Sequence, residues 1–516
     1  MKIDTQPPTV WGLYYFKLFL LPDKKTMQTE IDEVKKVFEE YNKEVISAID
    51  KLPQAGSERH YYRIHTSAKT FIATHGANIQ ENEAFIYFSA HFQKKQLSTP
   101  EIYYVSADKK IYIQEDFGDT SLLDKLESIG HINEVYALYK KSLTELAKLQ
   151  VKGDEGLDYE RCLTNSVFGK QAIMADLLYF KYYFLDALRR PYDKQKLIDD
   201  FEALSNYLSY TQYKYFMFRD FQSRNIMVTP PLQEGPGEVH FIDYQGGMKG
   251  APQYDVASLL SQARANLSDG WKKLLLEDYI DALENIIGET IDRNVFRSQY
   301  NGYVLIRMLQ VLGAYGFRGL FERKAHFLTS IPLALDNLKG FLQTQSIGIA
   351  VPEFIKVLEI CISDEVVQEF TNVKATVDTA LVVKINSFSY LKTGYPKDET
   401  KNGGGFVFDC RGILNPGRIE EFKTQSGQDK PVKDFLEQQT KMPDFLNSIY
   451  NIVDIAVEDY IKRGFENLAI NFGCTGGQHR SVYAADAVAR HLKNKFGVKI
   501  DLSHNNKENW VKSPRP

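Results

Sequence analysis

The segment FRDFQSRNIMV, residues 218–228, constrains the fold of this chain most, because it sets Asp220 and Asn225 five residues apart between apolar ends. A strand-like run, VHFID, follows and ends on Asp243, before a glycine-rich turn and a helix that starts near Asp255. Aspartate and asparagine also favour turns, since their side chains bond nearby backbone groups. Taken alone, the first pair therefore leaves a simple loop between two strands as the alternative.

The third polar residue gives the segment a chemical meaning. Asn225 and Asp243 supply the amide and carboxylate oxygens that Mg²⁺ prefers, beside phosphate oxygens. Asp220 supplies a carboxylate that can accept a hydroxyl proton. Phosphoryl transfer uses this division of labour, with one aspartate for the nucleophile and an Asn/Asp pair for the metal on ATP.

The flanking pattern changes from strands to helices. Residues 28–50 have a helical pattern, LPQAGSERHYYRIHTSAKTFIATHG indicates a hairpin with its turn at QAGS, and a helix with Glu83 precedes further strand-like runs. From about 120 to 340 the apolar residues recur with helical spacing. The sequence thus predicts a β-rich lobe carrying one helix, followed by a helical lobe that contains the 218–243 segment.

The motifs RDFQSRNIM and IDYQGGMKGAPQYDVASLL resemble the aminoglycoside phosphotransferase family of kinase-like enzymes. Together with LPQAGSERHYYRI and EDFGD, they are most similar to bacterial anomeric kinases of N-acetylmuramate and N-acetylglucosamine, which act in cell-wall recycling. The resemblance covers about residues 30–340. It implies a protein-kinase-like α+β bilobal fold, ATP and Mg²⁺ as cofactors and a small-molecule sugar substrate.

The resemblance also implies roles for single residues. Asp220 would be the catalytic base, and Asn225 and Asp243 the Mg²⁺ ligands. The expected nucleotide-binding residues are the phosphate-covering Ser57, the hinge at Glu115 to Gly118 with Phe117, and Arg59.

Two positions depart from the family motif. Phe218 stands where the motif has histidine, and an apolar residue can fill a packing position. The strand TFIATHG has Ala73 or Thr74 where a phosphate-binding lysine is expected, so phosphate binding would be weakened unless Lys69 or Arg59 substitutes or the subgroup functions without such a lysine. Glu83 would then lack its usual partner and be a solvated helix residue.

Composition and segment boundaries set the wider frame. The 516 residues carry a formal charge of −4, which gives no global attraction to nucleic acid or acidic membranes. Four scattered cysteines fit a reducing cytoplasm, with buried packing as their ordinary role. The run VWGLYYFKLFLL is interrupted by a lysine and too short for a bilayer, and we expect no membrane helix elsewhere. The expected parts are an extension at 1–26, a kinase-like domain at 27–344, a connector at 345–383 and a second domain at 384–516.

The last 133 residues hold 20 basic and 16 acidic residues, so this part is more basic than the rest of the chain. Its segment LAINFGCTGGQHRSVYAADAVARHL predicts a strand, a glycine-containing loop and a helix. Backbone N–H groups of such a loop form an anion site. Cys474 and Arg480 also match C-x5-R, so a cysteine phosphatase is the alternative to simple anion binding.

The motifs NSFSYLKTGYP, FVFDCRGILNP, SGQDKPV and GCTGGQHRS, over about 384–510, resemble the C-terminal domain of the RNase adapter family RapZ, which senses glucosamine-6-phosphate. The resemblance implies an α/β domain with an amino-sugar-phosphate site. RNA, which some members of that family bind, stays open as a partner, because the C-terminal tail is only weakly basic. The residues expected to form the sugar-phosphate site are Arg411, Asn415, Cys474, Thr475, Gly476, Gly477, His479 and Arg480.

Both resemblances concern amino sugars. The sequence therefore predicts a cytoplasmic sugar kinase joined to an amino-sugar-phosphate-binding domain. The alternative is a non-catalytic regulator, in which the kinase-like lobe only binds ligand and the basic domain contacts RNA or a protein.

Overall fold

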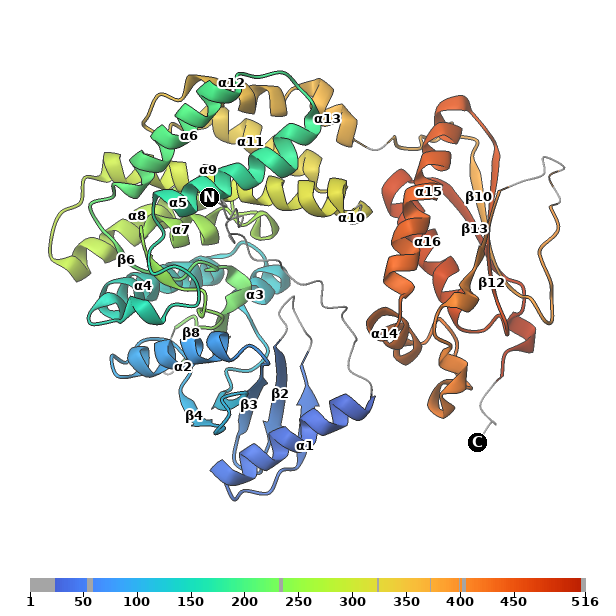
Figure 1. Ribbon diagram of the computed structural model, residues 1–516, viewed down its shortest axis with the longest axis horizontal. Helices are drawn as coiled ribbons and strands as arrows, with labels where there is room; N and C mark the ends of the chain where they lie inside the picture. The colour runs from blue at the N-terminus through green and yellow to red at the C-terminus, as the bar shows by residue number, and fades with distance from the viewer. Residues whose placement is uncertain are drawn as a thin grey trace, which may run out of the picture. The chain divides into compact units, whose positions relative to one another are not determined.

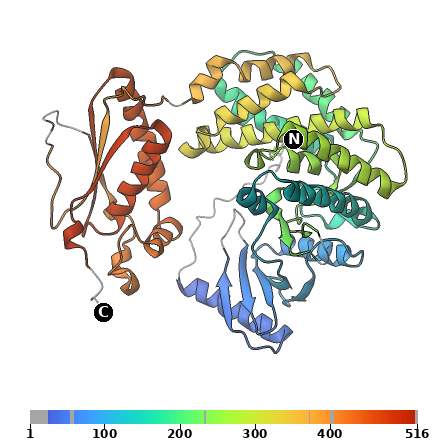
Figure 2. The same ribbon diagram turned by 180° about the vertical axis from the view of Figure 1, so that it is seen from behind.

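The computed structural model describes residues 24–52, 59–231, 235–322, 324–371, 373–398, 400 and 405–511. These form two compact units, Glu30–Val373 and a second that contains Lys374–Pro516. Each has a core of its own. Figures 1 and 2 show them from opposite sides.

The small lobe of the first unit is an antiparallel sheet in the order β1-β2-β3-β5-β4. The first two strands pair antiparallel. The predicted turn QAGS between them lies outside the described residues, and the first strand starts within residues 28–50, where a helical pattern was expected but the helix ends at Tyr41. Apolar side chains on one face of α1 (Lys24–Tyr41), among them Val34 and Phe38, pack on the sheet, while α2 (Ile79–Gln93) packs with the helical lobe. The strands are β1 (Ala48–Lys51), β2 (His60–His65), β3 (Thr70–His75), β4 (Ile102–Val105) and β5 (Ile111–Glu115).

The large lobe is helical and also holds two short antiparallel pairs of strands, and the 218–243 segment lies among these strands. Strand β6 (Tyr215–Met217) pairs with β9 (Met248–Gly250), and β7 (Ile226–Thr229) pairs with β8 (Glu238–Phe241). The helices are α3 (Leu122–Ile129), α4 (Asn133–Asp154), α5 (Lys170–Phe180), α6 (Lys194–Ser209), α7 (Gln253–Leu260), α8 (Asp269–Ile287), α9 (Arg293–Gly316), α10 (Ala325–Leu328), α11 (Ile331–Thr344), α12 (Pro352–Cys361) and α13 (Asp364–Phe370).

The expected connector at 345–383 is too long. Helices α12 and α13 lie within it, and Phe354, Val357, Leu358 and Val366 belong to the same buried core as the large lobe. An apolar face on each helix explains this packing, because an exposed linker would leave those side chains in water.

One stretch of the described residues, Arg293–Phe321, is long and apolar enough to cross a membrane by length and composition. This corrects the expectation that no stretch reaches that length. The stretch comprises α9 and a following π-helical turn. Its Tyr303, Leu305 and Leu309 are buried in the core of the large lobe, as in core helices that pass the same test.

The second unit is an α/β domain with a parallel sheet in the order β11-β12-β10-β13. Helix α16 packs on the sheet beside α15, and Figures 1 and 2 show both on the same side of it. Its elements are β10 (Val382–Ser389), β11 (Phe406–Asp409), α14 (Lys430–Gln438), α15 (Met442–Arg463), β12 (Asn467–Cys474), α16 (Arg480–Phe496) and β13 (Lys499–His504). The predicted strand, loop and helix are thus β12, 475–479 and α16.

Candidate functional site

A buried carboxylate holds the loop that carries Asp220. Asp255, in the first turn of α7, is fully buried and accepts the backbone N–H groups of Phe218 at 2.8 Å and Arg219 at 3.0 Å. The side chain of Gln150 donates to it at 2.9 Å. Burial raises the pKa of Asp255 to about 7, while these three donors oppose the rise. Asp255 therefore fixes the backbone immediately before Asp220.

The loop is also fixed by aromatic packing. Phe218 is fully buried, and its ring lies edge-on to those of Phe221 at 5.3 Å and Tyr244 at 5.9 Å. The apolar residue at the motif's histidine position thus fills a packing position, as expected. The next residue, Arg219, has φ +79°, a left-handed conformation that costs free energy in a non-glycine residue. Its bond to the carboxylate of Asp255 helps to hold it there.

The three predicted site residues come together. The side-chain nitrogen of Asn225 donates to the carbonyl oxygen of Asp220 at 2.9 Å and lies 3.4 Å from Oδ2 of Asp243. Since both partners are oxygens, the amide nitrogen faces them and Oδ1 of Asn225 remains for another ligand. The side chain of Asp220 is exposed. The site thus offers one accessible carboxylate beside an amide oxygen and a strand-end carboxylate.

Asp243 is held from the opposite side by a buried arginine. It has φ +73°, and its Oδ1 accepts Nη2 of Arg59 at 3.3 Å and Nε2 of Gln245 at 3.0 Å. Nη2 of Arg59 also lies 3.1 Å from Oε1 of Glu81 in α2. Burial lowers the pKa of Arg59, but its neighbours, including Tyr112 and both carboxylates, raise it above the usual value. The guanidinium therefore joins the strand-end carboxylate to α2 as a cation.

The two candidate substitutes for the missing lysine, Lys69 and Arg59, lie in different surroundings. Ala73 and Thr74 of β3 are fully buried, and the ammonium of Lys69 lies 4.3 Å from the centre of the Tyr103 ring. Arg59 is the cation that reaches Asp243.

The acidic partner of that cation on α2 is Glu81. Glu83 is a partly exposed helix residue that forms an ion pair with Lys109 and, among the described residues, has no partner on β3, whereas Glu81 faces Arg59. The two glutamates lie on different faces of α2, because two residues correspond to about 200° of helix rotation.

The hinge follows β5. Burial raises the pKa of Glu115, whose carboxylate accepts the backbone N–H of Glu101 at 3.4 Å. The ring of Phe117 stacks on His240 of β8, with 4.0 Å between ring centres. This contact joins the hinge to the large lobe. Ser57 lies outside the described residues.

Charged side chains gather on the large-lobe side of Asp220. Nη1 of Arg307 donates to the hydroxyl of Tyr254 at 3.1 Å, and Nη1 of Arg219 lies 4.0 Å from the carboxylate of Asp176. Burial lowers the pKa of Arg307, but Tyr254, Asp220 and Asp176 raise it above the usual value. Burial raises the pKa of Asp176, and the positive charges of Arg219 and Arg307 partly offset this rise. A polar wall of both signs therefore borders the exposed carboxylate.

In the second unit, the loop after β12 is fixed from within. Cys474 is buried, and its sulfur accepts the backbone N–H of Gly477 at 3.2 Å and lies 3.1 Å from the Ser481 hydroxyl. Gly477 has φ +60°, and a Cβ there would meet Ser389 at 2.9 Å and Asn506 at 3.0 Å. Only glycine fits this position without a shift of its neighbours.

The two basic residues of the loop are engaged as well. Arg480 is 4% exposed, and its Nη1 donates to the carbonyl oxygens of Arg411 at 3.1 Å and Ile413 at 2.8 Å. The His479 ring lies 2.9 Å from a backbone carbonyl oxygen, and burial lowers its pKa. A cysteine phosphatase needs an accessible thiolate facing phosphate, so the buried sulfur of Cys474 disfavours that alternative.

Other expected residues remain at the surface. Thr475 and Gly476 are exposed. Arg411 is also exposed, donates to Asp409 at 2.6 Å, and lies 4.2 Å from the centre of the Tyr390 ring. The side chain of Asn415 accepts the N–H of Gly417 at 3.2 Å and so caps a short helical turn.

Two family models match separate parts of the chain. Residues 51–289 match the phosphotransferase enzyme family, and residues 381–508 match the RapZ C-terminal domain. The chain joins a phosphotransferase-family domain to a RapZ C-terminal domain. The predicted families and the predicted fold classes of both parts are thereby confirmed.

Among its relatives is a nucleotide-binding protein of Fervidobacterium nodosum, 31% identical over 203 residues, which are 37% of this chain and 67% of the relative. A nucleotide-binding protein of Clostridium botulinum is 36% identical over 140 residues, 27% of this chain and 45% of the relative. The chain thus spans about two thirds of the first relative and under half of the second. An ethanolamine kinase structure from Plasmodium vivax aligns at 14% identity with a TM-score of 0.42, covering 64% of this chain and 92% of that one.

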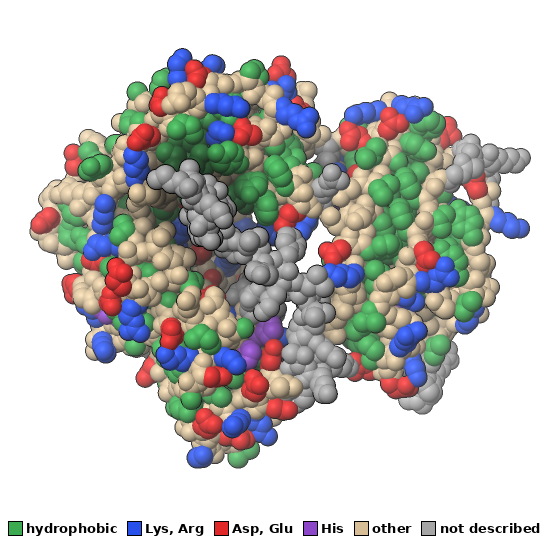
Figure 3. All heavy atoms as spheres, in the orientation of Figure 1, with side chains coloured by type: hydrophobic (Ala, Val, Ile, Leu, Met, Phe, Trp, Pro, Cys, Tyr) green, Lys and Arg blue, Asp and Glu red, His purple; other side chains and the backbone are tan. Residues whose placement is uncertain are grey.

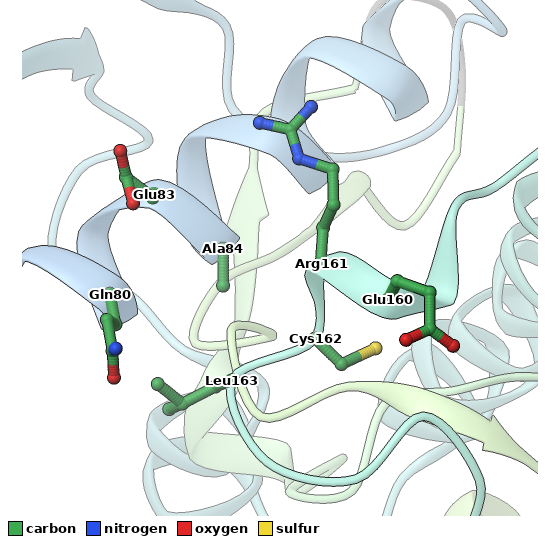
Figure 4. Close-up of a pocket in the computed structure, with 7 residues that line it drawn as sticks. All are labelled: Gln80, Glu83, Ala84, Glu160, Arg161, Cys162 and Leu163. Atoms are coloured by element: carbon green, nitrogen blue, oxygen red, sulfur yellow. The ribbon is translucent and has the colours of Figure 1, made fainter.

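A hollow of about 310 Å³ lies between the start of α2 and residues 160–163 (Figure 4). Its lining includes Gln80, Glu83 and Ala84, which share one face of α2, and Glu81 is not among them. The hollow is therefore separate from the pair that Arg59 forms with α2.

The surface of the RapZ C-terminal domain carries both signs of charge. On the face shown in Figure 3, basic side chains are interrupted by acidic ones around a band of apolar residues. The excess of basic residues in this part of the chain is therefore dispersed on that face.

Sequence reasoning missed Asp255 and Glu81 as site residues. The aspartate of the family's D-x-A motif was a usable signal for Asp255, because it falls at a helix start just beyond the metal-ligand strand. No sequence pattern pointed to Glu81 as a site residue, because its contact is with Arg59, 22 positions earlier in the sequence.

Proposed function

We propose that the phosphotransferase domain transfers the γ-phosphoryl group of ATP to a hydroxyl of an N-acetylated amino sugar in the cytoplasm. The observation that carries this proposal is the exposed carboxylate of Asp220 in the loop whose carbonyl oxygen orients Asn225. A base and a metal-ligand pair are thereby fixed relative to one another before substrate binds. Such positioning, with electrostatic stabilisation, is most of what phosphoryl transfer requires from a protein.

The residues present suit a magnesium ion. Oδ1 of Asn225 and the carboxylate of Asp243 are hard oxygen donors, and the amide nitrogen of Asn225 lies 3.4 Å from that carboxylate, so the two side chains are neighbours. A bound Mg²⁺ would neutralise charge on the phosphates during transfer. Asp220 accepts the proton of the acceptor hydroxyl, and the bonds from Asp255 keep this loop in place.

Arg59 acts as a positioning residue in this proposal. Its guanidinium binds Oδ1 of Asp243, while Oδ2 of Asp243 faces Asn225. The same guanidinium also pairs with Glu81 and so connects Asp243 to α2. The proposed role of Arg59 as the substitute for a phosphate-binding lysine on β3 rests on its ion pairs with Glu81 of α2 and with the metal-ligand carboxylate of Asp243.

The wall beside Asp220 favours a polyhydroxylated acceptor. Asp176 accepts hydrogen bonds, and Arg219 and Arg307 donate them. Sugar hydroxyls both donate and accept, so a wall with both kinds of group suits a sugar ring better than an apolar amine. This supports the amino-sugar class without defining which hydroxyl reacts.

For the RapZ C-terminal domain we propose binding of an amino-sugar phosphate at the 475–480 loop. Its support is the exposed backbone at Thr475 and Gly476 and the nearby exposed Arg411. Nε of Arg480 is buried without a hydrogen-bond partner among the described residues, which leaves one donor for a ligand. Glucosamine-6-phosphate is the first ligand to test.

The experiment is ADP release by the full chain with Mg²⁺-ATP and a panel of sugars, N-acetylglucosamine and N-acetylmuramate first. We expect release that depends on one of these sugars. ATP binding without turnover of any sugar would contradict the kinase proposal and favour the regulator alternative. Calorimetry with glucosamine-6-phosphate tests the second domain separately.

A further inference from the structure

A cluster of histidines and glutamates lies on the small lobe, apart from the phosphotransferase site. His60 and His75 stand directly opposite each other on β2 and β3, and their rings are stacked with 6.5 Å between centres. Glu30 of α1 places Oε2 2.7 Å from Nδ1 of His60. One ligand atom from each of these three residues lies within 4.8 Å of the others.

A fourth donor comes from the same helix. Glu33 is one turn beyond Glu30, and its Oε2 lies 3.4 Å from Nε2 of His75. Helix α1 thus presents two carboxylates to two imidazoles. The side chains of Glu30, His60 and His75 are only 12%, 14% and 16% exposed, which limits competition from water.

The cluster also has a supporting contact of the kind found around metal ligands. The hydroxyl of Tyr62 donates to Oε2 of Glu30 at 2.6 Å and fixes the carboxylate. Partners of this sort orient metal-binding side chains. The exposed pair of His65 and Asp50, on neighbouring strands of the same sheet, has one imidazole and one carboxylate only.

We propose that Glu30, Glu33, His60 and His75 bind a divalent transition-metal ion, with Zn²⁺ preferred. Two imidazoles and two carboxylates are a ligand set that suits Zn²⁺, and a tetrahedral ion would hold the ligand atoms about 3.3 Å apart. Nε2 of His75 and Oε2 of Glu33 already lie 3.4 Å apart, and Nδ1 of His60 and Oε2 of Glu30 lie 2.7 Å apart. Rotations of these side chains would bring all four ligand atoms to the tetrahedral spacing. The ion would join α1 to β2 and β3, beside the strand start that carries Arg59.

The test uses the full chain without an affinity tag, stripped by a chelator and titrated with Zn²⁺ or Co²⁺ in calorimetry. We expect one ion per chain, a visible Co²⁺ spectrum of a four-coordinate site and a higher Tm with Zn²⁺. His75→Gln and His60→Gln should each weaken binding at least 10-fold, and Tyr62→Phe about 10-fold, as for an outer partner of a metal ligand.

Two control variants distinguish Zn²⁺ binding at this cluster from binding at other histidines of the sheet and at the proposed Mg²⁺ site. His65→Gln removes a histidine of the same sheet and should bind Zn²⁺ like the unchanged chain. Asp243→Ala removes the proposed Mg²⁺ ligand and should also leave Zn²⁺ binding intact, so failure of the kinase proposal would not affect this result. Equal Zn²⁺ binding by the unchanged chain and by correctly folded His75→Gln, or no binding by the unchanged chain, would overturn the proposal.

Discussion

The two loops proposed to bind ligands, 218–225 and 474–480, differ in how their side chains are used. In the first, buried Asp255 and Phe218 fix the backbone, and the carboxylate of Asp220 is left exposed. In the second, Cys474 and Arg480 are themselves buried and bonded within the domain. The first loop therefore offers side-chain chemistry, whereas the second offers mainly backbone N–H groups to an anion.

Because of this difference, two predictions that were both made from the spacing of polar residues in a loop had different results. The spacing of Asp220 and Asn225 predicted a site, and the structure places both with Asp243. The C-x5-R spacing of Cys474 and Arg480 also matched a catalytic pattern, yet the thiol is buried and the guanidinium donates to backbone carbonyls. A motif shows reactive residue types, and only the contacts show whether they are free to react.

The largest effect is expected from Asp220→Asn, which keeps the shape of the side chain but cannot accept the hydroxyl proton. Sugar-dependent ADP release should fall by about 10²–10⁴-fold, the usual contribution of a general base. Asp269→Asn, at an exposed helix position, serves as the matched control. Activity of Asp220→Asn within about threefold of the unchanged chain would remove this residue as the base.

A smaller effect is expected at Arg59. Arg59→Met leaves Glu81 and Asp243 without their shared cation, and the loss of charge-assisted contacts of about 1.5–3 kcal/mol should lower kcat/KM by roughly 10–100-fold. Arg59→Lys should recover part of this loss. In contrast, Lys69→Met should have little effect, because Lys69 packs on Tyr103. An equal decrease of kcat/KM in Arg59→Met and Arg59→Lys would argue against a role for the positive charge of Arg59.

In the second domain, Arg411→Ala should weaken glucosamine-6-phosphate binding about 10-fold, since one exposed charged contact is lost. The variant should melt like the unchanged chain. Arg480→Ala should weaken binding and also lower Tm, because its bonds to two carbonyl oxygens hold the loop. Calorimetry and thermal unfolding of both variants separate the two roles, and unchanged binding in Arg411→Ala would place the ligand elsewhere.

The smallest effect concerns pH. Burial lowers the pKa of His240, beneath Phe117, and of His479 in the second loop. As pH falls below about 6.5, the unfolded chain takes up these protons before the folded one does, so the free energy of unfolding should decrease. His240→Gln and His479→Gln should each flatten this decrease between pH 7.5 and 5.5 in urea unfolding. An unchanged slope in both variants would contradict the assignment.

Much of the fold was predictable because it depends on local patterns. Strand β2, the helical lobe and the strand before Asp243 follow from apolar spacing, whereas β1 starts in a segment whose pattern predicted a helix. The expected connector was wrong, since Phe354 and Val366 pack against helices distant in sequence. The boundary of a core depends on such contacts, which periodicity does not reveal.

The candidate site was predictable to a similar extent. Asp220, Asn225 and Asp243 have fixed spacing within one loop and one strand end. The pairing of Arg59 with Glu81 was not predictable, because the cation precedes β2 rather than lying on β3, and the glutamate belongs to a separate helix. Only the fold of the small lobe brings these charges together.

The most direct test of the account is Mg²⁺-dependent ADP release measured with N-acetylated amino sugars for the unchanged chain and Asp220→Asn in parallel. We expect sugar-dependent release by the unchanged chain and at least a 100-fold loss in the variant, with ATP binding retained. Sugar-dependent release of similar size in both proteins, or ATP binding without release for every sugar, would contradict it.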